Sequence, residues 1–119
     1  MTVAQSGPWV YLLLTAEELR ASEASGHWIS GSLAEEGFIH ASPYDQLERV
    51  ANKHYRQKAD VHLVRVRVDR LKSELRWEPA AGSLYPHIYG PVNWDAVDEI
   101  RPTVRNADGL FRFSSLSTD

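Results

Sequence analysis

Apolar residues along this chain recur at spacings that predict a short succession of strands and helices. The first apolar run covers residues 9–14 and ends at Thr15, which is typical of a buried strand. Thr15 and Glu18 have the spacing of a capping box, so a helix is expected over residues 16–25, ended by Gly26. The chain therefore begins with a strand that leads directly into a helix.

A second helix is expected after a loop and a short strand. Residues 27–32 are predicted to form the loop, and residues 37–40 a strand whose last residue is a histidine. Ser42 is a suitable N-cap and Pro43 is tolerated at the first helical position. Apolar residues then recur at helical spacing as far as Tyr55.

The second half of the chain predicts mainly strands. Valine alternates with arginine in residues 61–68, as in an antiparallel strand with one face in water. Residues 75–77 predict a short strand, and residues 78–83 a loop because of their proline and glycine. Residues 85–91 form a tight aromatic segment, and residues 97–104 predict a last strand whose proline places it at a sheet edge.

These elements define the expected fold class, α+β. Strands and helices interleave, but their connections are too short for many parallel crossovers, so we expect a small mixed, mainly antiparallel sheet with two main helices. The length fits one domain over residues 1–119, with a core over about 9–105 and a tail over 106–119. The tail either packs as a strand through Leu110, Phe111 and Phe113 or mediates a dimer.

Charge and composition restrict the partners that we expect. The net charge is -3 and the 13 Lys and Arg residues are dispersed, so we expect no nucleic-acid partner. Cysteine is absent, which excludes disulfides and thiolate metal sites. The N-terminus has no basic leader, and residues 10–14 are too short to span a membrane. We therefore expect a cytoplasmic protein that binds a small molecule, with no membrane partner.

Two segments carry the side chains that are best suited to chemistry. His40 at a strand end and Ser42 at a helix start suit an anion or polar ligand, although each side chain also fits a purely structural role. Residues 85–91 hold Tyr, His, Pro and Gly close together, so a Tyr or His there is positioned rigidly for hydrogen bonding or proton transfer. A turn that packs aromatic rings over the core is the alternative.

One carboxylate, Glu78, and the five histidines are further candidates for chemistry. Glu78 lies between Trp77 and Pro79, where an apolar wall would raise the pKa of its carboxyl and suit acid–base catalysis. An exposed loop carboxylate fits the same sequence. None of the five histidines forms a pair at metal-ligand spacing, so we expect no metal. Phosphate-binding loops, dinucleotide fingerprints and serine-hydrolase motifs are missing.

Several segments together resemble the bacterial family called domain of unknown function 952, over about nine tenths of the chain. The resemblance rests on the following residues: Val10-Tyr11, residues 32–42, Gln46, residues 50–52, Tyr55, residues 76–78 and residues 85–91.

This resemblance implies a fold like that of ADP-ribosyltransferases and RNA 2'-phosphotransferases, with a split sheet and a cleft for NAD between its two halves. It implies NAD as the cofactor to test, lying against the strand that ends at His40 and against Ser42. The family usually has a histidine after the first-strand tyrosine, where this chain has Leu12. A leucine donates no hydrogen bond to a ribose hydroxyl.

The candidate site follows from these segments and from the resemblance. The expected catalytic residues are His40, Glu78, His87 and Tyr89, and the expected ligand-binding residues are Leu12, Ser42, Gln46, Trp77, Tyr85 and Gly90. The expected function is a small-molecule-binding domain, with enzymatic activity left open. Two alternatives remain: a non-catalytic accessory domain, and an enzyme that acts on an apolar metabolite.

Overall fold

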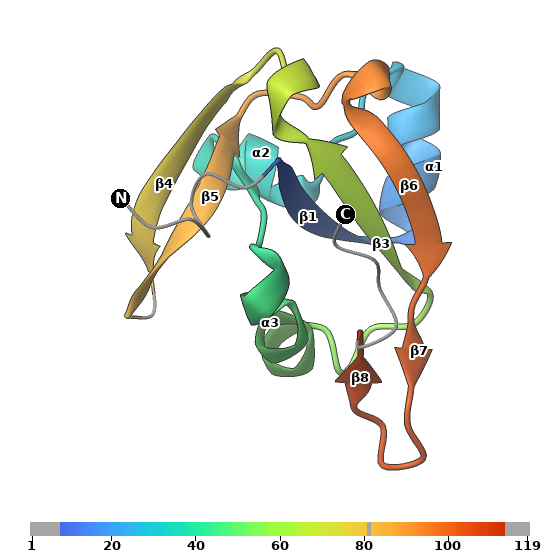
Figure 1. The fold of residues 1–119 in the computed structure, drawn as a ribbon. Helices are drawn as coiled ribbons and strands as arrows, with labels where there is room; N and C mark the ends of the chain where they lie inside the picture. The colour runs from blue at the N-terminus through green and yellow to red at the C-terminus, as the bar shows by residue number, and fades with distance from the viewer. Residues whose placement is uncertain (1–7, 81, 114–119) are drawn as a thin grey trace.

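Two three-stranded antiparallel sheets form the framework of the protein (Figure 1). The computed structural model describes residues 8–80 and 82–113. In this part of the chain every strand pair is antiparallel, as expected for an α+β fold with few helices. The first sheet has the order β1 (Trp9–Thr15), β3 (Val61–Arg67), β6 (Val97–Pro102); the second has the order β2 (Ile39–His40), β5 (Ser83–Tyr89), β4 (Glu74–Ala80); and β7 (Val104–Arg105) pairs with β8 (Phe111–Arg112).

The helices are short, and the first agrees with the sequence prediction. Helix α1 (Ala16–Ser25) has the predicted capping box, in which the Glu18 amide donates to Thr15 Oγ1 at 3.2 Å, and it ends at Gly26. The predicted loop over 27–32 is wrong at its end, because α2 (Gly31–Glu36) begins inside it. Gly37 takes a left-handed conformation that ends α2 after six residues. Within the described residues, no helix is long and apolar enough to cross a membrane.

The prediction of a loop over residues 78–83 is also wrong. Strand β4 continues to Ala80, and β5 begins at Ser83 and includes most of the tight aromatic segment expected at residues 85–91, for which a turn was the alternative. Pro79 is tolerated because β4 is an edge strand. Pro86 lies in the central strand, where its carbonyl still accepts a hydrogen bond from the Ala41 amide at 3.0 Å.

Ser42 joins the two sheets instead of capping a helix. Its amide donates to the Tyr11 carbonyl at 2.8 Å, and its carbonyl accepts from the Tyr11 amide at 2.9 Å. Helix α3 (Leu47–His54) begins later, after a 3-10 turn at Tyr44–Gln46 that follows Pro43. The prediction of a helix N-terminus with free amides at Ser42 is therefore wrong, because sheet pairing uses its amide.

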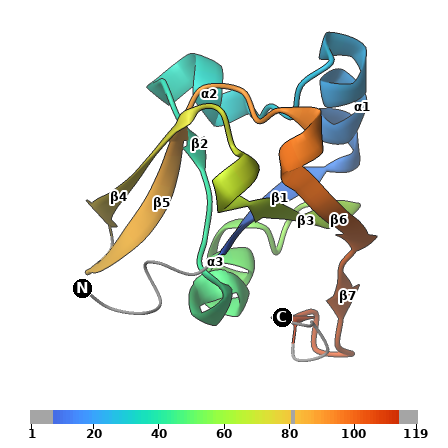
Figure 2. The same ribbon diagram turned by 45° about the horizontal axis from the view of Figure 1, so that its top comes forward.

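Strand β1 is buried on both faces, which gives the protein two connected cores. Leu12 belongs to a cluster that fills the space between the two sheets, together with Ile39, Val64 and Ile88. The opposite face of β1 packs into a second cluster, which β1 and β3 share with α3 and the C-terminal segment: Tyr11, Leu13, Leu47, Ala51, Val61, Leu63, Phe111 and Phe113. Figure 2 shows α2 and α3 on opposite sides of β1.

Strand β3 confirms the alternation of valine with arginine, with Val64 and Val66 fully buried and the intervening Arg65 half-buried. The prediction that one face lies in water is wrong in part, because Val61 and Leu63 on the arginine face are buried in the second cluster. Strand β6 lies at a sheet edge, as its proline predicted. The tail beyond Asn106 packs in part as a strand, since β8 carries the buried Phe111 against α3.

We expect Gly90→Ala to destabilise the protein by about 1–3 kcal/mol. Gly90 has φ 149°, and an added Cβ would lie 2.5 Å from Ser73 Oγ and 3.1 Å from its Cβ. Ser73 cannot turn away without losing its 2.6 Å hydrogen bond to the Pro91 carbonyl. Urea unfolding measures the loss, and Ser73→Ala is the control for that bond alone. A Gly90→Ala variant as stable as the wild type would contradict the packing described here.

Candidate functional site

The strand β5 brings three polar aromatic side chains to one face of the second sheet. Side chains alternate between the two faces of a strand, so Tyr85, His87 and Tyr89 share one face while Pro86 and Ile88 turn to the core. The register pairs His87 of β5 with His40 of β2 on one side and with Arg76 of β4 on the other. The face therefore collects titratable groups from three strands.

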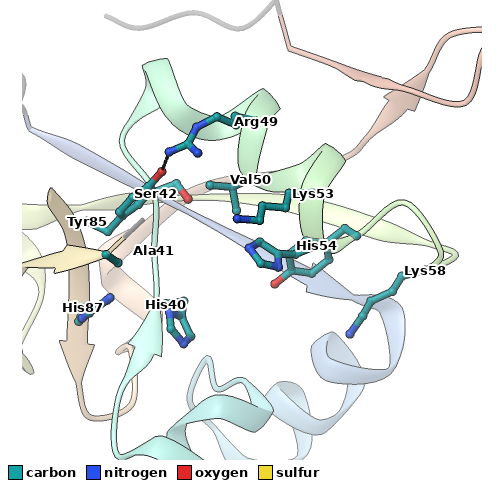
Figure 3. Close-up of a pocket in the computed structure, with 12 residues that line it drawn as sticks. His40, Ala41, Ser42, Arg49, Val50, Lys53, His54, Lys58, Tyr85 and His87 are labelled. Atoms are coloured by element: carbon teal, nitrogen blue, oxygen red, sulfur yellow. Dashed lines mark hydrogen bonds between the residues drawn. The ribbon is translucent and has the colours of Figure 1, made fainter. Parts of the chain in front are cut away.

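A pocket of about 340 Å³ lies between this face and helix α3; we call it the α3 pocket (Figure 3). The second sheet and the segment Ala41-Ser42 after β2 supply one wall, and α3 with Tyr55 and Lys58 after it supplies the other. The lining residues are His40, Ala41, Ser42, Arg49, Val50, Lys53, His54, Tyr55, Lys58, Ala80, Tyr85 and His87.

One carboxylate organises the polar side chains on this face. Glu78 Oε1 accepts hydrogen bonds from His87 Nδ1 at 2.8 Å and from the Tyr89 hydroxyl at 2.5 Å. The side chain of His87 is only 8% exposed, whereas that of Glu78 is 32% exposed. The imidazole is thus held between a carboxylate and the pocket that it lines.

These hydrogen bonds keep Glu78 ionised. The bond from Tyr89, followed by that from His87, holds the pKa of Glu78 below its ordinary value of 4.5. The same bond to Glu78 raises the pKa of Tyr89 above 10.0. The expectation that an apolar wall raises the pKa of Glu78 is therefore wrong, because Trp77 points to the opposite face of β4 and packs against the core.

Aromatic packing fixes the position of the His87 ring. Phe38 stacks on it with ring centroids 4.2 Å apart and planes inclined by 24°. His40 approaches the same ring edge-on at 5.2 Å and pairs through Nε2 with Glu36 at 3.1 Å. The His40 side chain is 53% exposed, so it lies at the mouth of the pocket while His87 lies deeper.

A second group of hydrogen bonds connects the sheet to α3. Arg49 donates to the Tyr85 hydroxyl and, at 2.9 Å, to Gln46 Oε1. The Tyr85 hydroxyl also donates to Gln46 Oε1 at 3.2 Å. These contacts hold α3 at a fixed position over β5.

The structure brings together most, but not all, of the residues predicted for the site. His40, Ser42, Tyr85 and His87 line the α3 pocket, and Glu78 and Gln46 contact lining residues directly. Tyr89 lies one step further out, since its hydroxyl donates to Glu78. The other three lie elsewhere: Leu12 is buried in the core between the sheets, Trp77 packs against that core, and Gly90 follows β5 beside Ser73.

The helical wall of the pocket was missed from the sequence. Arg49 and Lys53 are four residues apart, and so are Val50 and His54, so each pair shares one side of α3. This spacing was visible in the sequence, but nothing there showed that the helix faces the histidine strand. Within the described residues, no group of three or more His, Cys, Asp or Glu is arranged to hold a metal ion.

We expect Tyr89→Phe to raise the pKa of Glu78 towards its ordinary value, because the strongest hydrogen bond to the carboxylate is lost. A lowered pKa stabilises the fold above the ordinary value of 4.5, and this stability is lost as pH falls through the folded-state pKa. The variant should therefore lose less stability on acidification than the wild type.

Carbon-13 NMR of the Glu78 carboxyl and unfolding measured below pH 5 test this expectation. Tyr44→Phe is the matched control, since its hydroxyl donates to the Phe113 carbonyl instead. An unchanged Glu78 titration in Tyr89→Phe would contradict the hydrogen-bond assignment.

The fold and site define a small α+β protein with a pocket between a helix and a sheet, in which a carboxylate orients an imidazole. Residues 13–100 match the model of the family described as protein of unknown function (DUF952), and the chain belongs to this family. No curated protein matches the sequence.

Solved structures of a similar protein agree with the fold. The crystal structure of protein CC0527 from Caulobacter crescentus is 30% identical, covers 87% of this chain and 93% of its own, and superposes with a TM-score of 0.79. The solution NMR structure of CC0527, also 30% identical, covers 87% of this chain and 90% of its own, with a TM-score of 0.72.

Proposed function

We propose that this protein binds a small molecule in the α3 pocket and transfers a proton to or from it through His87. The observation that carries the proposal is the 2.8 Å hydrogen bond between Glu78 Oε1 and the Nδ1 of a histidine that lines the pocket. Carboxylate–imidazole pairs of this kind occur where a histidine acts as a general base or acid.

The geometry supports Nε2 of His87 as the nitrogen that acts. When the Nδ1–H group donates a hydrogen bond to Glu78, the neutral ring keeps a lone pair on Nε2. This nitrogen can then accept a proton from the ligand. The ionised Glu78 stabilises the imidazolium that forms. Phe38 stacks on the ring and limits its rotation, so the acceptor stays in place.

An ADP-ribosyltransferase-like arrangement is the finer form of this proposal. Two small sheets linked through Ser42 and Tyr11, with a pocket beginning at that link, support it. The burial of Leu12 in the core places the first-strand position outside the pocket lining. NAD is therefore one ligand of the test, and a non-catalytic binding domain is one of its outcomes.

The test is a thermal-shift titration of the purified protein with NAD, ADP-ribose, nucleotides and a panel of apolar and sugar metabolites. The same panel is applied to His87→Gln and Glu78→Gln. The matched control is His27→Ala, which removes an exposed histidine outside the pocket. We expect at least one compound to stabilise the wild type and the control but not the His87 variant.

The variants separate catalysis from binding. A compound that is converted by the wild type, and about 10²–10⁴ times more slowly by both variants, supports acid–base catalysis. Binding without conversion supports a non-catalytic domain. A ligand that both variants bind and convert as well as the wild type does would contradict the role given to His87.

A further inference from the structure

The charge of the α3 pocket is opposite to that of the protein as a whole. The chain has a net charge of -3, yet the lining includes Arg49, Lys53 and Lys58 and contains no Asp or Glu. Three histidines add proton donors or acceptors to the same lining. A concave site with one sign of charge raises the local concentration of ligands of the opposite sign.

The cations of the pocket are not neutralised in place. Among the described residues, Arg49, Lys53 and Lys58 form no ion pair with a carboxylate. Arg49 donates to the neutral Gln46 and Tyr85, and Lys58 Nζ lies 5.4 Å from the centre of the Tyr55 ring. The pocket therefore presents positive charge that an anionic ligand would balance.

Arg49 and Lys53 are the most suitable pair to hold an anion. They are four residues apart on α3 and so lie on one side of the helix, and Figure 3 shows both on the pocket wall. Arg49 is already oriented by Gln46 Oε1 at 2.9 Å, which lowers the entropy cost of binding. A guanidinium with a neighbouring ammonium is a recurrent way to bind phosphate oxygens.

The volume restricts the size of the ligand. A pocket of about 340 Å³ is near the lower end of the range for small-molecule sites. A compact phosphomonoester fits such a volume, with its phosphate at the helix wall and its other end towards His87. The two walls then have separate roles, because the helix anchors the phosphate and the sheet carries the imidazole.

We propose that the α3 pocket takes a small phosphorylated ligand whose phosphate binds Arg49 and Lys53. This proposal rests on the proposed function and names the chemical class of its ligand. No bond of the ligand is made or broken at the helix wall, so the two cations are binding residues and not catalytic ones.

The test uses amide NMR titrations and calorimetry with inorganic phosphate, ribose 5-phosphate and ribose. They are carried out on the wild type, Arg49→Gln and Lys53→Gln, with Arg20→Gln, an exposed cation of α1, as the matched control. We expect ribose 5-phosphate to bind at least about tenfold more tightly than ribose, and more weakly as NaCl is raised.

Each helix substitution should weaken ribose 5-phosphate binding by about tenfold, whereas Arg20→Gln should leave it unchanged. Three results would overturn the proposal: ribose binding as tightly as ribose 5-phosphate, no response of the pocket amides to either phosphate, or a phosphate response that both helix variants retain. If a neutral ligand then bound in a way that His87→Gln weakened, the proposed function would stand and the phosphate proposal would fall. Phosphate binding that is insensitive to His87→Gln supports the anion site at Arg49 and Lys53 but not the proposed role of His87.

Discussion

Phe111→Ala is expected to lower the free energy of unfolding by about 3–5 kcal/mol. Phe111 is fully buried in the cluster that includes Leu47 and Ala51 of α3. Its amide donates to Asn52 Oδ1 at 2.7 Å, and its carbonyl accepts from Asn52 Nδ2 at 3.3 Å. Truncation would leave a cavity beneath the helix that carries Arg49 and Lys53.

Urea unfolding measures this loss, and Arg112→Ala is the matched control because Arg112 is the exposed neighbour in β8. The control should change stability by no more than about 0.5 kcal/mol. A dimer contact is the alternative role of the tail. A loss below about 1 kcal/mol, or unfolding that depends on protein concentration, would favour the dimer contact over the packing described here.

Leu12→His is expected to destabilise the protein by about 3 kcal/mol or more, without creating affinity for NAD. Leu12 is 1% exposed and lies in the apolar cluster between the two sheets. An imidazole there would replace apolar contacts and bury ring nitrogens among Ile39, Val64 and Ile88. A histidine at this position would have no polar partner among these neighbours.

Unfolding and NAD titration of the same sample test both parts of this expectation. Leu12→Met keeps the volume and apolar character, so as a control it should cost less than about 1.5 kcal/mol. If Leu12→His were as stable as the wild type and bound NAD, residue 12 would face an open cleft. That result would restore the cleft implied by the family resemblance.

Local patterns were enough to predict several elements of the fold. The capping box of Thr15 and Glu18 and the alternation over Val61–Arg67 are short-range signals, and both correspond to observed elements. Pro79 and Pro86 misled the interpretation, since a proline is compatible with a strand when its missing amide faces no acceptor. The period-two spacing of Tyr85, His87 and Tyr89 was the better signal for β5.

The site was harder to predict, because it depends on contacts between distant segments. The sequence showed that His40 and His87 have suitable chemistry, but the register that sets them opposite each other is a property of the sheet. Glu78 was expected to meet an apolar wall, whereas strand alternation turns it towards His87 and Tyr89. The cationic wall of α3 was missed because only tertiary packing places that helix over β5.

Nitrogen-15 NMR of the His87 ring, with and without ribose 5-phosphate, tests the role of His87 most directly. We predict that in the neutral ring Nδ1 carries the proton and Nε2 is the acceptor, and that the Nε2 signal moves when the ligand binds. Glu78→Gln should abolish this preference between the nitrogens. If Nε2 carries the proton in the wild type and is unaffected by any pocket ligand, His87 is not a base held by Glu78 and the proposed function is wrong.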